Sequence, residues 1–307
     1  MSSHTQKTIK NIINFYGVGL HNGIKANLKV IPADENFGIK FCRTDIDKKD
    51  LIDANYQNVV EPILCTKIKN KNGITVSTVE HLMAAFFGEG VDNALVEIDA
   101  SEVPILDGSA SEFVEAIRST GIREQKELRK YIKVLKKVEI HEEGKYISIE
   151  PLNNDLIVDF EIVYSNPLIR TRRKEFKMSN GNLTSIYNSR TFCLYEDIDQ
   201  IRNLGLAKGG SLENAIVVMD NKILNEDGLR NRHEFIEHKI LDCLGDLMLS
   251  GHRVFGHVKT SQGGHLLTNT LLRQFFSNKS NWEFESFSNL EETSKNTKYP
   301  KTVAVNA

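Results

Sequence analysis

The residues with the clearest potential for chemistry lie on one predicted helix, at about residues 232–249. His238 and Asp242 are four residues apart on it, so they lie only about 40° apart on the helix surface. An imidazole and a carboxylate so placed can share one ligand. A solvated helix face can carry the same pair. Because Gly245 and Leu249 continue the stripe, we expect this face to pack against another element.

The segment before this stripe resembles a zinc-protease motif but has the wrong spacing. The pattern H-E-x-x-H places its histidines four residues apart, whereas His233 and His238 are five apart. Five residues correspond to about 140° around a helix, so these two rings cannot face one metal ion. We expect His233 to lie at the surface.

A second candidate is Glu80-His81, at the start of another predicted helix. Ser77 and Glu80 fit a capping box, in which case His81 is only a partly buried neighbour. However, zinc hydrolysis requires a general-base carboxylate close to a metal-binding imidazole. His81, His238 and Asp242 would supply two nitrogens and one oxygen and leave a fourth position open for water, as in catalytic zinc sites.

The elements that must position these residues are predicted to occur in two copies. Three short matches in one order favour a duplication rather than chance. Their offsets are 121, 120 and 122 residues: 93–99 with 214–220, Asp107-Gly108 with Asp227-Gly228, and 112–115 with 234–237. On this alignment Ala116 in the first copy corresponds to His238 in the second. The candidate metal ligand is therefore present only in the second copy.

Each copy has an α+β pattern, because a buried strand, an Asp-Gly turn and an amphipathic helix follow one another. In the first copy, Ser109 and Glu112 predict a capped helix that ends near Thr120 before Gly121, and the helix after Ser77 should end at Gly88. In the second copy we expect helices at 196–204, 232–249 and 266–276, and strands at 131–138, 146–150 and 156–163.

Composition suggests where the domains end. Residues 123–130 are charged and lack an apolar period, so we predict domains at 1–125 and 126–281 and a polar, flexible tail at 282–307. The 307 residues include 39 Lys and Arg against 41 Asp and Glu, which argues against nucleic acid as a main partner.

The chain shows no sign of export or membrane insertion. Its first ten residues lack the apolar core of a secretory signal, and apolar runs such as 82–87 are too short to span a bilayer. The cysteines at 42, 65, 193 and 243 form no C-x-x-C pair and are expected to be packed thiols. We predict a cytoplasmic, monomeric protein without a transmembrane segment.

Motifs running in order from residue 17 to about 276 resemble the UDP-3-O-acyl-N-acetylglucosamine deacetylases, zinc enzymes that commit Gram-negative bacteria to lipid A synthesis. Each motif alone is only modestly specific for this family, but together the motifs are highly specific for it. They are GVGLHNG at 17–23, TVEHLMAA at 78–85, PILDGS at 104–109, SRTF at 189–192, LAKGGS at 206–211, NEDGLR at 225–230, HKILDxxGD at 238–246 and GH at 264–265.

The resemblance implies two related α+β domains, each a β-sheet layered with helices, with the active site between them. It also implies hydrolysis of an acetamide, with zinc held by the three ligands named above. Glu80 would take the proton of water as general base, and Thr191 would donate to the oxyanion. His265 would be a cationic acid that Asp246 orients, although its spacing also fits a histidine on a surface loop.

The substrate implied is UDP-3-O-acyl-N-acetylglucosamine, together with water. Lys239 would reach a phosphate, unless it is an ordinary solvated lysine. Family members usually have a lysine at the position of Gln262, so phosphate binding here would depend more on Lys239 and Lys259. His21 lies in a matching motif but has no predicted role. The segment that resembles the acyl-chain region, whose apolar spacing also fits a core, includes Phe192, Leu194, Ile198, Ile201, Leu204, Leu206 and Gly210.

Two other functions fit much of the pattern. A duplicated sugar-nucleotide-binding protein would keep the cleft without chemistry, but it would have no need to retain Glu80 and His265 along with the ligands. A zinc amidase acting on a different N-acetyl sugar is the nearer alternative.

Overall fold

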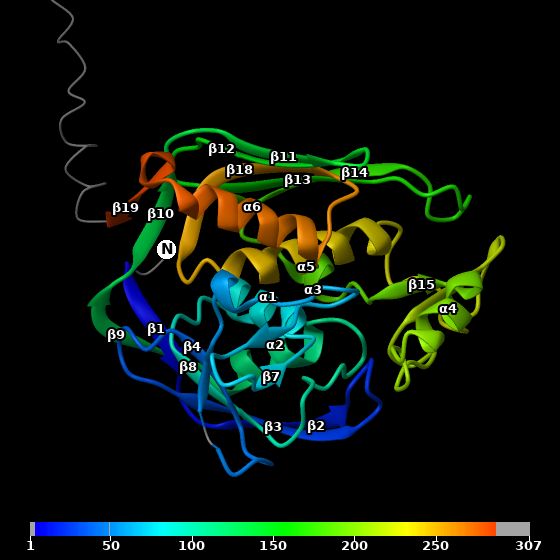
Figure 1. The fold of residues 1–307 in the computed structure, drawn as a ribbon, viewed down its shortest axis with the longest axis horizontal. Helices are drawn as coiled ribbons and strands as arrows, with labels where there is room; N and C mark the ends of the chain where they lie inside the picture. The colour runs from blue at the N-terminus through cyan, green and yellow to red at the C-terminus, as the bar shows by residue number, and fades with distance from the viewer. Residues whose placement is uncertain (1–3, 49, 287–307) are drawn as a thin grey trace, which may run out of the picture.

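The computed structural model describes residues 4–48 and 50–286. Two β-sheets form the outer layers, and helices fill the space between them (Figure 1). Helices α1 (Glu80–Glu89) and α2 (Ser111–Thr120) belong to the first half of the chain, and α5 (Glu234–Met248) and α6 (His265–Ser277) to the second. None of the helices in the described residues is both long and apolar enough to cross a membrane.

Among the described residues, the sheet of the first half has five strands in the order β2-β3-β8-β4-β5. Only the β8–β4 pair is parallel. Along β3, alternate residues such as Ala26, Leu28 and Val30 are buried, as expected for a sheet with one face against helices. The strands are β2 (Ile13–Val18), β3 (Lys25–Pro32), β4 (Ile39–Arg43), β5 (Leu51–Asp53) and β8 (Ala94–Ile98).

The second half repeats this arrangement with the order β11-β12-β18-β13-β14, in which only the β18–β13 pair is parallel. Two further strands extend it, because β10 pairs with the start of β18 and β19 pairs with β10. The strands are β10 (Lys130–Val134), β11 (Val138–Glu142), β12 (Lys145–Glu150), β13 (Leu156–Ile162), β14 (Arg172–Lys177), β18 (Arg253–Ser261) and β19 (Trp282–Ser286). The strand predicted at 131–138 instead ends at Val134, and β11 begins at Val138 after a break.

The α+β class and the two similar halves are confirmed, but the predicted alignment of the copies is wrong. Residues 214–220 contain β16 (Ile216–Met219), which belongs to a separate three-stranded sheet with β15 (Phe192–Leu194) and β17 (Lys222–Ile223). The strand that occupies the place of β8 is β18, and α1 and α5 are the helices that precede these two strands. His238 therefore corresponds to a position in α1 and not to Ala116.

The predicted boundaries cut through regular structure. The one at 125/126 falls inside β9 (Ile122–Leu128), which pairs with β1 (Thr5–Ile9). The one at 281/282 separates β19 from its sheet, so the expectation of a flexible tail is wrong for residues 282–286; residues 287–307 lie outside the described part. The short elements are β6 (Ile68–Lys69), β7 (Thr75–Val76), α3 (Thr184–Tyr187), α4 (Ile198–Asn203) and 3₁₀ turns at Tyr56–Asn58, Met178–Asn180, Tyr195–Asp197 and Lys279–Asn281.

Neither predicted capping box forms. The Ser77 hydroxyl donates to the Ser101 carbonyl, and α1 begins with Glu80 itself. The Ser109 hydroxyl donates to the Asp107 carboxylate, and α2 begins two residues later. Helix α2 ends at Gly121 as predicted, whereas α1 continues past Gly88. Since Glu80 has no role as a cap, its side chain is available to the interior.

Candidate metal centre and active site

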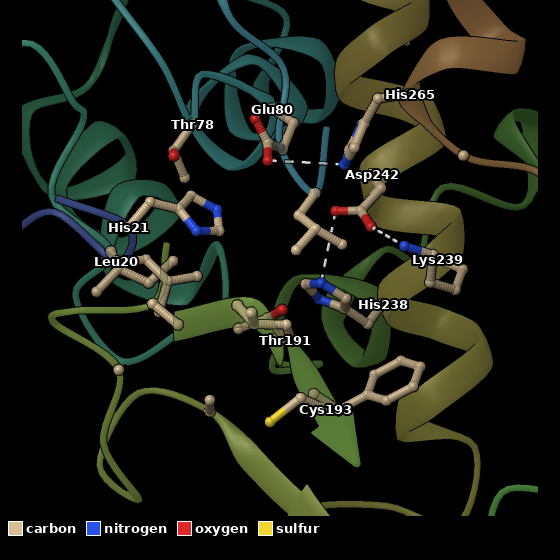
Figure 2. Close-up of a pocket in the computed structure, with 18 of the residues that line it drawn as sticks. Leu20, His21, Thr78, Glu80, Thr191, Cys193, His238, Lys239, Asp242 and His265 are labelled. Atoms are coloured by element: carbon tan, nitrogen blue, oxygen red, sulfur yellow. Dashed lines mark hydrogen bonds and ion pairs between the residues drawn. The ribbon is translucent and has the colours of Figure 1, made fainter. Parts of the chain in front are cut away.

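A cavity of about 640 Å³ lies where the two halves meet. Helix α1, helix α5, strand β15 and the start of α6 each contribute to its wall. Figure 2 shows the side chains of Glu80, His238, Asp242 and His265 converging from these elements. The cavity thus collects residues that are far apart in the sequence.

His81, His238 and Asp242 form one buried cluster, with ligand atoms that all lie within 4.8 Å of one another. The Nε2 atoms of both histidines are 3.5 Å from Oδ1 of Asp242. His81 comes from α1 in the first half, and the other two come from α5 in the second. The structure therefore brings together the three residues that were predicted as metal ligands.

The approach of α1 to α5 depends on Gly245. A Cβ atom at this position would lie 2.1 Å from the carbonyl oxygen of Glu80, far inside contact distance. The predicted stripe on α5 therefore packs against α1 directly through backbone. This close packing places His81 opposite Asp242.

The charges in the cluster suit a divalent metal. Burial lowers the pKa of His238 to about 3, and its Nδ1 lies 3.0 Å from the Ser189 carbonyl oxygen. Nδ1 is therefore the protonated nitrogen, and the lone pair of Nε2 faces Asp242. Burial alone would raise the pKa of Asp242, but its charged neighbours, among them the Lys239 ammonium, outweigh this effect and hold the pKa well below its usual range. The neutral imidazole of His238 and the carboxylate anion of Asp242 are the forms in which these side chains bind zinc.

Glu80 and His265 face each other beside this cluster, with Oε1 of the glutamate 3.7 Å from Nε2 of the histidine (Figure 2). Burial raises the pKa of Glu80. Burial opposes protonation of His265, but Asp246 and Glu80 outweigh it and raise the pKa of His265 to about 9. Asp246 Oδ2 lies 2.8 Å from His265 Nδ1, which is the contact that the predicted orienting role requires.

Thr66 contacts two of these carboxylates, and no sequence pattern predicted it. Its backbone N–H donates to Oε2 of Glu80 at 3.0 Å, and its hydroxyl donates to Oδ1 of Asp246 at 2.6 Å. Thr66 is 1% exposed. No local pattern marks it, because its two partners are 14 and 180 residues away in the sequence.

Thr191 lines the cavity and is held by the first half of the chain. Its N–H donates to the Gly108 carbonyl at 2.8 Å. Gly108 has a φ of 84°, and a Cβ there would lie 2.0 Å from the Asn214 carbonyl oxygen, so a glycine is needed. The Asp107-Gly108 turn, which the sequence marked as a repeat match and as part of the PILDGS motif, therefore positions a cavity residue of the other half.

Lys239 also lines the cavity, but its ammonium is not free at the cleft edge. Its Nζ donates to Oδ2 of Asp242 at 2.7 Å (Figure 2). A substrate phosphate would have to share this ammonium with Asp242. Gln262 lies in the same wall, whereas Lys259 pairs with Glu150 at 2.8 Å.

His21 is buried in the cavity wall, and neither of its ring nitrogens has a hydrogen-bond partner among the described residues. Burial lowers its pKa. His233 is half-buried just before α5, and its Nε2 accepts from Arg232, so it takes no part in the cluster.

The predicted acyl-chain residues are divided by the structure. Phe192 and Gly210 line the cavity, together with Ile198 and Ile201 on α4. Leu194 and Leu206 are not among the lining residues. Leu194 packs against the hydrophobic core, and the reversal at Gly205, with a φ of 78°, breaks the helical spacing assumed for Leu206. Leu204 is 64% exposed.

A family model described as LpxC, UDP-3-O-acyl N-acetylglycosamine deacetylase, matches residues 6–277. Proteins named UDP-3-O-acyl-N-acetylglucosamine deacetylase are similar along almost the whole chain. The one from Mannheimia succiniciproducens is 40% identical over 98% of this chain and 99% of its own length. Those from Histophilus somni and Hahella chejuensis are 42% and 44% identical, over 94% and 92% of this chain and 95% and 94% of theirs. With this coverage and the site geometry in agreement, the chain belongs to the UDP-3-O-acyl-N-acetylglucosamine deacetylase family.

Proposed function

We propose that this chain hydrolyses the N-acetyl group of UDP-3-O-acyl-N-acetylglucosamine and releases acetate, the committed step of lipid A biosynthesis. One observation carries the proposal: a buried His-His-Asp cluster shares a cavity with a buried carboxylate and a cationic histidine. The names of the relatives supply the substrate. We also propose that the protein works as a monomer in the cytoplasm.

The residues present fit a zinc ion. His81 and His238 would supply nitrogen and Asp242 oxygen, which is a donor set of catalytic zinc sites. When bound, zinc supplies Lewis-acid chemistry, polarising a carbonyl and making water more acidic. Ser189 supports this assignment because its carbonyl fixes the tautomer of His238.

The other side chains would divide the proton transfers. Glu80 would accept a proton from the attacking water through Oε1, the oxygen that Thr66 leaves open. The Thr191 hydroxyl would donate to the oxyanion that develops on the acetamide oxygen. As the C–N bond breaks, His265 would give its Nε2 proton to the departing amine, and Asp246 would stabilise the cation before that transfer.

The cavity offers places for the rest of the substrate. Phe192, Ile198 and Ile201 give one part of the wall an apolar surface, which suits an acyl chain. Lys239 and Gln262 lie in the same wall and would face the nucleotide phosphates.

The test combines zinc analysis of the purified chain with an acetate-release assay on the acylated UDP-N-acetylglucosamine. We expect about one zinc ion per chain and acetate release that a chelator abolishes and added zinc restores. Equal release from UDP-N-acetylglucosamine without the acyl chain would favour an amidase for other N-acetyl sugars. Tight substrate binding without any acetate release would instead identify a binding protein.

The pH profile should show the cation of His265. Because its pKa is raised to about 9, the acid form is present below that pH, and turnover should decline as pH rises through it. In His265→Gln, kcat should fall by about 10²- to 10⁴-fold and this alkaline decline should vanish. His141→Gln, at an exposed position of β11, is the matched control and should keep the wild-type profile. An unchanged alkaline limb in His265→Gln would assign the acid role elsewhere.

A further inference from the structure

Thr66 joins the two carboxylates that the proposed reaction uses for proton transfer. Its N–H and hydroxyl contact Glu80 and Asp246, and its carbonyl accepts from the N–H of Val79, the residue before α1. All of its backbone and side-chain polar groups are therefore engaged, in a place closed to water. A residue outside the helices thus links α1 of the first half to α5 of the second.

The two contacts divide the oxygens of each carboxylate. In Glu80, Thr66 holds Oε2, and Oε1 faces His265. In Asp246, Thr66 holds Oδ1, and Oδ2 contacts the ring of His265. A hydrogen bond at one oxygen restrains the rotation of a carboxylate and so restrains the direction of its other oxygen. The contacts of Thr66 with Oε2 of Glu80 and Oδ1 of Asp246 therefore help to direct the other oxygen of each carboxylate toward His265.

We infer that Thr66 is a positioning residue that sets the geometry between the general base and the acid. The inference rests on the proposed function, since it concerns the proton transfers of that reaction. Hydrogen bonds to a charged carboxylate are among the stronger ones in proteins, so the hydroxyl is well suited to hold Asp246. Without it, Asp246 could turn, and the ring of His265 would lose its fixed direction.

Thr66→Val removes the hydroxyl and keeps the shape of the side chain. We expect kcat to fall by about 10- to 100-fold, since small displacements of catalytic groups have effects of this size. KM should stay close to wild type, because the substrate contacts remain. Thr66→Ser, which keeps the hydroxyl, should recover most of the turnover. Zinc content should remain near wild type in both variants. Tm should fall by a few degrees in Thr66→Val, because Oδ1 of Asp246 loses its buried donor, and should recover in Thr66→Ser.

A double-mutant cycle with Asp246→Ala separates positioning from general damage. If Thr66 acts through Asp246, then Thr66→Val should change kcat by less than about twofold once the aspartate is absent. A purely structural effect would persist in that background. Thr8→Val is the matched control, because the Thr8 hydroxyl is buried in β1 and donates to the Asn93 carbonyl far from the cavity. Its kcat should equal that of the wild type.

The possible failures are distinguishable. A wild-type chain that releases no acetate would overturn the proposed function. Wild-type kcat in Thr66→Val, or an undiminished effect of that change in the Asp246→Ala background, would overturn this inference alone. So would a loss of zinc or a lowered Tm that Thr66→Ser fails to restore.

Discussion

In the His238→Ala chain, bound zinc should fall from about one ion per chain to almost none, and acetate release should disappear. His238 contributes one of the two imidazoles of the cluster, and its ring is already fixed by the Ser189 carbonyl. Removing it leaves one imidazole and one carboxylate, too few ligands for a tight tetrahedral site. Metal analysis after gel filtration and the acetate assay measure both losses.

The control for this variant lies just before the same helix. His233→Ala removes the histidine that the H-E-x-x-H pattern would have chosen, but its ring contacts Arg232 and not the cluster. It should keep zinc and turnover. Zinc loss in His233→Ala with retention in His238→Ala would contradict the site proposed here.

The Glu80→Gln chain should retain zinc and bind substrate with little change in KM, while kcat falls by about 10²- to 10⁴-fold. Glutamine has the same shape, and its amide oxygen can still accept from the Thr66 N–H, but it cannot take a proton from water. The loss should therefore appear in the chemical step alone. Steady-state kinetics together with zinc analysis distinguish it from loss of the metal.

Glu115→Gln offers a comparison, since Glu115 is exposed on α2. Its kinetics should match those of the wild type. Normal turnover in Glu80→Gln would show that another group activates the water, and the mechanism proposed here would be wrong.

The sequence predicts the class of fold and its duplication because buried strands and amphipathic helices leave local patterns. However, the sequence matches predicted the wrong correspondence between the elements of the two copies. Residues 93–99 and 214–220 both contain a short buried strand, but any buried strand of β-branched residues has this pattern. The correspondence of β8 with β18 becomes evident only from strand order and pairing direction, which depend on contacts distant in the sequence.

The candidate site, too, could be predicted only in part from the sequence. The chemical types of His81, His238 and Asp242 and the helical spacing of the last two suggested a metal site, and the structure places them together. The capping boxes predicted at Ser77 and Ser109 do not form, because the Ser77 hydroxyl donates to the Ser101 carbonyl and the Ser109 oxygen accepts from the N–H of Ser111 and not of Glu112. Thr66 could not be found, since a threonine becomes important only through the two carboxylates that the fold brings to it.

Gly245 sets the distance between α1 of the first half and α5 of the second. No side chain separates α5 from the first turn of α1 there, so the width of that seam is set by main chain alone. A methyl group at position 245 would force α1 away from α5. Glu80 and His81, which lie on α1, would then both move away from Asp242. The distance between the ligands on α1 and those on α5 is therefore set by backbone contact, and it requires a residue without a side chain at position 245.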